Sequence, residues 1–123
     1  ISVGVMENPE FSKMVITTVG TEKQIAQIVK QLDKMIDTIE VKRLDEKESV
    51  YKELALFKVK LSDASDSAEI NKLANTFGAK IHNEQENSLI VELTSTPDEI
   101  KSFEESIKSF DILDSARTGV TAL

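Results

Sequence analysis

The stretch Glu53-Leu-Ala-Leu-Phe-Lys-Val-Lys-Leu61 has an apolar residue at every second position, which is typical of a β-strand with one buried face. The apolar positions of that face are Ala55, Phe57, Val59 and Leu61. Leu54 and Leu56 make the opposite face partly apolar as well. Because a strand that is apolar on both faces belongs inside a sheet, this stretch predicts a central strand.

The segment after this strand predicts a helix and a return strand. Asp66 is a candidate N-cap, with Glu69 three residues later as its capping-box partner. Gly78 is typical of the position just past a helix, and residues 79–83 predict a short strand. The apolar stripe of this helix is Ile70, Leu73, Ala74 and Phe77.

A second strand–helix–strand unit follows. Residues 88–94 predict a strand, and Thr96-Pro97-Asp98-Glu99 predicts a helix start with a cap, a proline at the first position and a capping-box glutamate. Ile100, Phe103, Ile107 and Phe110 are predicted to face the core, and residues 112–116 predict the last strand. Two such units make a ferredoxin-like βαββαβ domain of the α+β class, which we assign to residues 49–123.

Residues 1–48 predict only part of a second such domain. A strand at 14–19 is followed by Gly20, and Thr21 opens a helix in which Gln24 completes a capping box. Residues 38–44 predict a strand, and residues 1–6 predict a strand with no helix before it. The sequence therefore predicts an N-terminal domain whose opening strand and helix are missing. The alternative is that a partner chain supplies the missing edge. The apolar positions of its helix are Ile25, Ile28, Val29, Leu32, Met35 and Ile36.

Composition excludes several classes of function. The formal net charge of −7 disfavours general binding to nucleic acid, since an acidic surface repels phosphates. The apolar runs are too short to span a membrane. With no cysteine there is no disulfide, thiolate nucleophile or zinc–thiolate site, and a reducing, cytoplasmic setting is compatible. The sequence opens at Ile1 and not at a methionine, so the absence of a signal peptide decides little.

The residues assemble no reaction centre, so we predict a binding protein with no catalytic residue, no metal ligand and no cofactor of its own. The single histidine, His82, is expected to be a solvated residue on a strand. The carboxylates are expected on solvated helix faces and in the charged linker 44–49. Arg117-Thr118-Gly119 leaves two interpretations open, an anion site or a turn after the last strand.

Six segments, in order, resemble the small subunit of acetohydroxyacid synthase, also called acetolactate synthase. They cover essentially the whole chain, and their order is more specific than any one of them. The helix Gln27-Ile-Val-Lys-Gln-Leu32 and the strand Lys52-Glu-Leu-Ala-Leu-Phe-Lys-Val59 are similar to the longest family motifs. The other four are Asn8-Pro-Glu-Phe-Ser-Lys-Met14, Phe77-Gly-Ala-Lys-Ile81, Ser88-Leu-Ile-Val-Glu92 and Ala116-Arg-Thr-Gly119.

The resemblance implies an N-terminal ACT domain, a C-terminal ferredoxin-like domain and a homodimer or higher homo-oligomer. It implies a catalytic large subunit as partner, which uses thiamine diphosphate, Mg²⁺ and FAD. It also implies that the small subunit raises catalytic activity in branched-chain amino-acid biosynthesis and confers feedback inhibition by valine or a related amino acid.

The family's main effector loop would lie upstream of Ile1. The positions that match the neighbourhood of the effector site are Ser2 and Gly4 on the expected strand and Gln27 on the helix. Each also has a structural interpretation, strand packing for Ser2 and Gly4 and a solvated helix face for Gln27.

Two other functions compete with this one. A stand-alone ACT-type amino-acid sensor of another enzyme or of transcription fits the fold, although no basic DNA-binding helix is present in these residues. A small enzyme of the acylphosphatase kind would need an anion-binding loop after a strand, and no strand here is followed by one.

Overall fold

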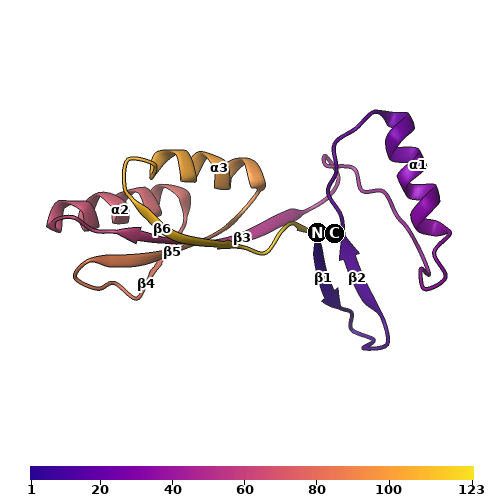
Figure 1. The fold of residues 1–123 in the computed structure, drawn as a ribbon, viewed down its shortest axis with the longest axis horizontal. Coiled ribbons are helices and arrows are strands. Elements are labelled where there is room, and N and C mark those ends of the chain that lie inside the picture. The colour runs from indigo at the N-terminus through magenta and orange to yellow at the C-terminus, as the bar shows by residue number, and fades with distance from the viewer. The chain divides into compact units, whose positions relative to one another are not determined.

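The computed structural model describes all residues, 1–123. The chain divides into two compact units. Unit 1 comprises Ile1–Tyr51 with Ala122–Leu123, and unit 2 comprises Lys52–Thr121. Figure 1 shows the elements of both units along the chain.

Unit 2 contains two helices and an antiparallel sheet with four main strands. Its strands run in the order β4-β5-β3-β6, so β3 is central, as predicted. This strand order, with a helix after β3 and another after β5, is the ferredoxin-like βαββαβ arrangement, and the predicted fold class is confirmed. The elements are β3 (Tyr51–Lys60), α2 (Ala64–Phe77), β4 (Lys80–His82), β5 (Ser88–Ser95), α3 (Pro97–Ser106) and β6 (Ile112–Arg117).

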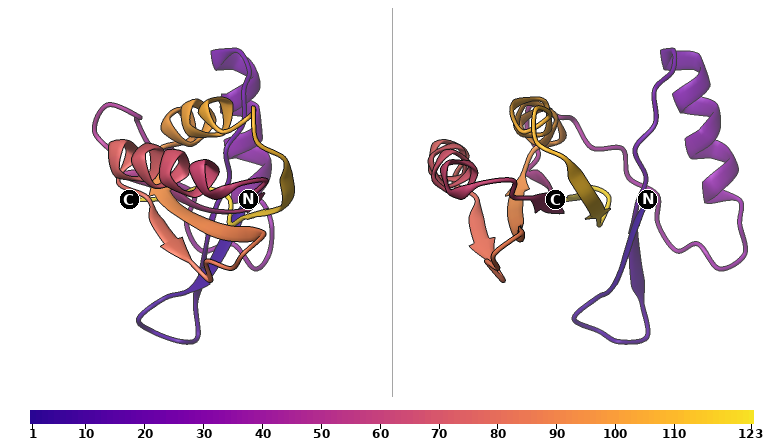
Figure 2. Two further views of the ribbon diagram at one scale, coloured as in Figure 1. Left: turned by 90° about the vertical axis from the view of Figure 1, so that its left-hand side faces the viewer. Right: turned by 60° about the vertical axis from the view of Figure 1, so that its left-hand side comes forward.

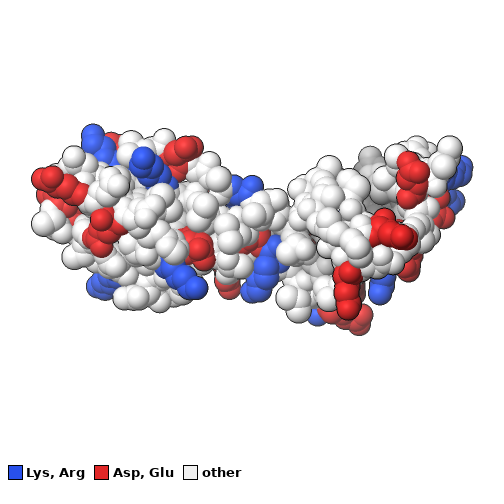
Figure 3. All heavy atoms as spheres, turned by 90° about the horizontal axis from the view of Figure 1, so that it is seen from below, with Lys and Arg blue, Asp and Glu red and all other residues white.

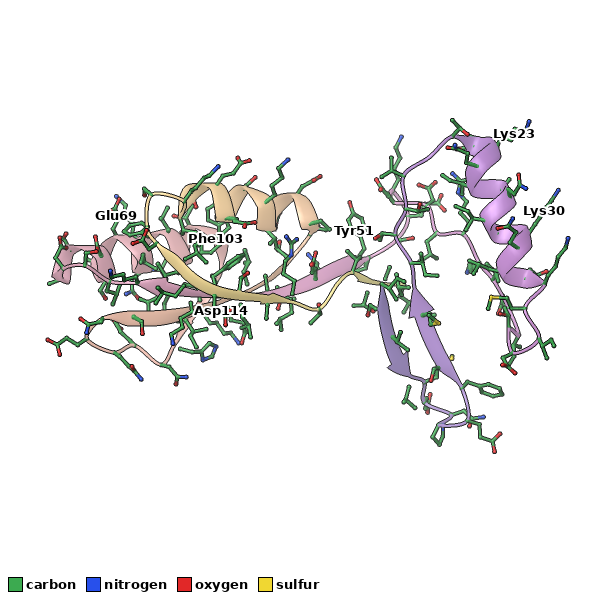
Figure 4. All side chains as sticks on the ribbon, in the orientation of Figure 1. Lys23, Lys30, Tyr51, Glu69, Phe103 and Asp114 are labelled. Atoms are coloured by element: carbon green, nitrogen blue, oxygen red, sulfur yellow. The ribbon has the colours of Figure 1, made fainter.

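The core of unit 2 lies between the helices and one face of the sheet. Figure 2 shows α2 and α3 on the same side of the strands. Phe103 lies on the side of α3 that faces the sheet (Figure 4). The centroid of its ring is 5.9 Å from that of Phe57 and 5.2 Å from that of Phe77. Each fully buried side chain of this size contributes about 1.5–3 kcal/mol. The largest fully buried side chains are Phe57, Phe103, Ile70, Leu89, Leu93, Ile100, Ile107, Val59 and Val91.

The start of α2 corrects the prediction that Asp66 caps it with Glu69. The N-cap is Asp63, whose carboxylate accepts hydrogen bonds from the N–H groups of Ser65 and Asp66. Asp66 instead completes the capping box from inside the helix. The helix begins earlier because Asp63 satisfies donors that would otherwise lack partners. Gly78 ends α2 in the left-handed conformation, at φ 73°, as predicted.

The start of α3 was predicted at the correct residue. The Thr96 side chain accepts a hydrogen bond from the Glu99 N–H, and Pro97 occupies the first helical position. However, the Glu99 carboxylate does not complete a capping box and accepts the hydroxyl of buried Ser95 instead. The Ser95 hydroxyl would otherwise be buried without a hydrogen-bond partner, so the Glu99 carboxylate satisfies a buried polar group instead of the helix start.

Unit 1 consists of a β-hairpin and one helix. The elements are β1 (Ser2–Val5), β2 (Ser12–Val15) and α1 (Glu22–Asp33). The predicted capping box is confirmed, because Thr21 accepts from the Gln24 N–H and Gln24 accepts from the Thr21 N–H. The predicted strand 14–19 is displaced, since β2 covers Ser12–Val15.

Two further predictions in unit 1 are wrong. Residues 38–44 form no strand, because no neighbouring strand supplies hydrogen bonds to them. The helix ends at Asp33, so Met35 and Ile36 lie outside it and are exposed. A short strand that was not predicted, β7 (Thr121–Ala122), pairs with β3, and Val50 and Leu123 exchange backbone hydrogen bonds of 2.8 and 2.9 Å.

The apolar residues of unit 1 are mostly uncovered. No residue from Ile1 to Tyr51 is buried. Val3 and Val5 of β1 are 61% and 70% exposed, and Met14, opposite Val3 on β2, is 58% exposed. Since residues of this type are normally buried, unit 1 has a hydrophobic face but no core. None of the helices in either unit combines the length and the hydrophobicity that crossing a membrane would require.

Candidate functional site

Ser2 and Gly4 lie on the same face of the β1–β2 hairpin. Ser2 is opposite Val15 and Gly4 is opposite Lys13, so residues two apart on β1 point to one side. A Cβ atom built on Gly4 would meet nothing within 4 Å. The backbone at Gly4 is therefore open to a ligand, and no packing in unit 1 requires a glycine there.

The outer edge of β1 is unpaired, since β1 has β2 as its only neighbour. An edge strand presents N–H and C=O groups along its free side. These are the groups that would bind the carboxylate and ammonium of an amino acid. The hairpin thus offers backbone ligands beside Ser2 and Gly4.

Gln27 lies on α1 and is exposed. It lines a shallow hollow together with Val19, Gly20, Gln24 and Ile28. A Cβ atom on Gly20 would approach the Gln24 Oε1 atom to 2.9 Å, so a larger residue there would push the Gln24 amide aside. Ser2 and Gly4 are not in the lining, and the structure does not bring the three predicted residues into one site.

The outer face of α1 is polar and charged. Lys23 and Lys30 project away from the helix in Figure 4. Glu22 forms a bidentate pair with Arg43, with oxygen–nitrogen distances of 2.7 and 2.9 Å. The hydrogen bonds and charge of Arg43 lower the pKa of the Glu22 carboxyl. Both side chains are well exposed, so solvent screens the ion pair and it contributes little to the stability of the fold.

The Arg117-Thr118-Gly119 segment forms a structured turn. The Arg117 guanidinium donates from Nε and Nη2 to the two carboxylate oxygens of Glu53, at 2.8 and 3.0 Å. The Thr118 hydroxyl accepts from the Leu54 N–H at 3.1 Å, and Gly119 has a φ of 82°. The hydrogen bond to Glu53 raises the pKa of Arg117. Because Glu53 already occupies the guanidinium, the structure favours a turn over an anion site.

His82 is an exposed residue on β4, as predicted. Its Nε2 atom lies 3.0 Å from a carboxylate oxygen of Glu92 on β5. The chain brings no three His, Asp or Glu side chains close enough together to hold a metal ion. His82 and Glu92 therefore form a cross-strand pair on the sheet surface.

A second hollow, in unit 2, is lined mainly by polar and acidic residues that the sequence did not single out as a binding site. The carboxylate of Asp63 has a lowered pKa because the Ser65 hydroxyl and the backbone N–H of Asp66 donate to it. Asp66 accepts from the N–H groups of Ser62 and Asp63. These carboxylates are already engaged in capping. The lining residues are Lys60, Ser62, Asp63, Asp66, Glu69, Ser109, Phe110 and Asp111.

Known proteins similar to this chain share one description. A family model described as the small subunit of acetolactate synthase matches residues 52–123. A probable acetolactate synthase small subunit of Methanothermobacter thermautotrophicus is 37% identical over 123 residues, which is all of this chain and 73% of that protein. The acetolactate synthase small subunit of Mycolicibacterium smegmatis is 32% identical over the same length, 72% of that protein.

A solved structure extends the similarity to three dimensions. The crystal structure of an acetolactate synthase small subunit from Thermotoga maritima matches with a TM-score of 0.91 and 31% sequence identity. The match covers 99% of this chain and 76% of that chain. The similarity therefore includes residues 1–51 as well as the part matched by the family model.

Proposed function

Because the chain belongs to the acetolactate synthase small-subunit family, we propose that it is the non-catalytic, regulatory subunit of an acetolactate synthase. The observation that carries this proposal is that a relative and a solved structure of the same description both match the chain over nearly its full length. A regulatory subunit acts by binding and needs no reaction centre.

The proposed partner is the catalytic large subunit. Thiamine diphosphate, Mg²⁺ and FAD would belong to that subunit. This chain would raise its activity through contacts on the surface of unit 1 or unit 2. The whole assembly would work in branched-chain amino-acid biosynthesis, in the cytoplasm.

The proposed effector is valine or a related branched-chain amino acid, bound at unit 1. The free edge of β1 at Ser2 and Gly4 supplies backbone donors and acceptors. Gln27 lies apart from this edge, so its exposed side-chain amide would reach the same effector only in an arrangement that brings α1 and the hairpin together. Binding regulates the catalytic subunit only if that subunit distinguishes the bound from the free arrangement of unit 1.

We also propose that unit 1 is part of an ACT domain, completed by a strand and a helix that precede Ile1. The uncovered apolar residues of the hairpin support this, since Val3, Val5 and Met14 would gain a cover. A complete domain would bury these side chains, and each Å² of apolar surface removed from water stabilises the fold by about 25 cal/mol. A partner chain that supplies the same elements is the alternative.

Copurification and activity with a large subunit from the same source test the regulatory role. The chain is expected to bind the large subunit and to raise acetolactate formation, with valine reversing the increase. Failure both to bind and to stimulate would refute the regulatory assignment. Binding and stimulation without valine reversal would refute the effector proposal alone.

A substitution on α1 tests the effector site. Gln27→Ala is expected to weaken valine inhibition about fivefold, since one hydrogen bond contributes about 1 kcal/mol. Lys30→Ala, three residues along the same helix, is the matched control and is expected to leave the inhibition constant unchanged. Equal inhibition constants for all three proteins would remove Gln27 from the site.

A stand-alone amino-acid sensor remains the second candidate, favoured only by the exposed edge and hollow of unit 1. It predicts valine binding in calorimetry with no effect on any large subunit. The same pair of measurements therefore separates the two functions.

A further inference from the structure

The side of α1 opposite its apolar face carries a row of basic and amide side chains. Residues spaced four, three and four positions apart lie above one another on one face of a helix. Lys34, which follows the last residue of α1, keeps right-handed helical backbone angles and so continues the row. All members of the row are exposed. We call it the basic stripe, and its residues are Lys23, Gln27, Lys30 and Lys34.

The lysines of the basic stripe have no acidic partner within the chain. None of the three ion pairs in the structure includes a lysine. Glu22, next to Lys23 in the sequence, is already held by Arg43. In Figure 3, basic atoms lie along the edge of unit 1 that carries α1, and acidic atoms lie further in. The stripe is thus an unpaired positive feature of a chain whose formal net charge is −7.

The basic stripe stays free when unit 1 is completed. A preceding strand and helix would cover the apolar faces of α1 and of the hairpin, because those faces gain most from leaving water. Lysines are almost never fully buried without a partner, so the stripe is not expected to pack inside its own domain. The apolar residues of α1 lie on the opposite side of the helix and are half-buried, at Ile25, Ile28, Val29 and Leu32.

The length of the stripe indicates what binds it. Lys23 and Lys34 are separated by about three turns of helix, about 16 Å along the axis. A single small anion reaches only one end of such a row. A nucleic acid or an anionic membrane would also approach the many carboxylates of this acidic chain, which repel it. A folded protein surface that carries carboxylates at matching positions fits the stripe best.

From these observations we propose that the basic stripe of α1 binds an acidic surface of the catalytic large subunit. The proposal rests on the proposed function, which requires a contact with that subunit and does not place it. Complementary charges raise the rate of association and fix the register of two surfaces, and salt weakens both effects. Gln27, between the lysines, adds an amide donor and acceptor to the contact.

Charge substitution tests the contact. The dissociation constant between the chain and a large subunit from the same source is measured by biolayer interferometry at about 50 mM and about 300 mM salt. Lys23→Glu and Lys34→Gln are each expected to raise the constant about three- to tenfold at low salt and less at high salt, where charges are screened. Lys23→Glu places a carboxylate in the first turn of α1, where it favours the helix, so weaker binding would not result from helix loss.

Two lysines outside unit 1 provide matched controls. Lys72→Glu on α2 and Lys101→Glu on α3 make the same charge change as Lys23→Glu at exposed positions, and both are expected to leave the dissociation constant unchanged. Lys23→Arg keeps the charge and is expected to bind like the wild type. The valine inhibition constant, measured with saturating chain, is expected to be the same for every stripe lysine variant, because the lysines set the affinity for the large subunit.

The outcomes separate this contact from the regulatory role itself. If the wild type binds and stimulates the large subunit and the stripe variants bind equally well, the contact lies elsewhere and the regulatory role stands. If the wild type does not bind, both proposals fail. Equal weakening by the stripe and control variants would reveal a general effect of net charge and overturn the contact. So would wild-type binding to phosphatidylserine vesicles that Lys23→Glu abolishes, with unchanged affinity for the large subunit.

Discussion

Glu53 is a buried carboxylate of unit 2 whose side chain has one partner. Its side chain is 8% exposed, and both of its oxygens accept hydrogen bonds from Arg117. Glu53→Gln would remove the negative charge and replace one of the two acceptor oxygens by an NH2 group, while the Arg117 guanidinium stays in place. We expect the free energy of unfolding of unit 2 to fall by about 2 kcal/mol, below the usual value for a buried pair because Arg117 is 39% exposed. Urea denaturation followed by circular dichroism measures this change.

The exposed Glu22–Arg43 pair provides the matched control. It has the same bidentate geometry at similar distances. Glu22→Gln is expected to leave the unfolding transition of unit 2 unchanged, because solvent screens the pair and it lies in unit 1. If both glutamine variants shifted that transition equally, burial would not explain the contribution of Glu53.

The role of Arg117 could not be predicted from the sequence alone. Glu53 and Arg117 are 64 residues apart, and they meet because β3 and β6 are neighbours with Arg117 opposite Ala55. Alternating apolar residues predict that each strand exists, but they do not specify the register between strands. The same holds for Gln27, whose helix was predicted but whose separation from Ser2 and Gly4 was not.

At the scale of elements, local patterns predicted most helices and strands but only some of their ends. The capping box of α1, the cap of α3 and Gly78 are signals within four residues of one another in sequence, and all three were correct. Residues 38–44 have a strand-like pattern but no partner strand, and a strand is stable only when its backbone groups are paired. For α2, both Asp63 and Asp66 have an acidic residue three positions on, so the pattern alone allowed two starts.

Substitution of Asp63 and of Glu69 distinguishes those starts. Asp63→Ala removes the acceptor for the first N–H groups of α2, and the amides of Ser65 and Asp66 are expected to exchange with solvent about five- to tenfold faster. Glu69→Ala, at the position predicted to pair with Asp66, should leave those amides unchanged. Hydrogen exchange measured by NMR resolves the individual amides.

The contribution of Asp63 should also depend on pH. Its pKa is lowered in the folded protein by hydrogen bonds from Ser65 and Asp66, so folding favours the ionised form. The stabilisation is complete above the ordinary carboxyl pKa and is lost as the pH falls through the lowered folded value. The exchange difference between the wild type and Asp63→Ala should therefore disappear at strongly acid pH. A difference that persisted there would point to a cause other than the carboxylate.

At the scale of the whole molecule, the two units differ in how their apolar residues are used. Unit 2 buries most of the residues that the alternating and helical patterns predicted, including Ile100, Phe103 and Ile107, while Leu73, Phe77 and Phe110 are half-buried against the core. Unit 1 contains equally regular patterns, yet none of its residues from Ile1 to Tyr51 is buried. Periodicity predicts which face of an element is apolar, but burial requires a second element to cover that face.

This difference predicts unequal protection from hydrogen exchange in the 123-residue chain. Amides of β5 and α2 are expected to exchange only when unit 2 unfolds, at least about a hundredfold more slowly than those of α1. The amides of α1 should exchange through local opening, because an isolated helix of 12 residues without a core is marginally stable in water. A longer form that carries the proposed preceding strand and helix should protect α1, since the apolar faces of α1 and the hairpin would then be covered. If α1 were as protected as α2 in the 123-residue chain, its half-buried side chains would suffice for stability, and no completing segment would be needed.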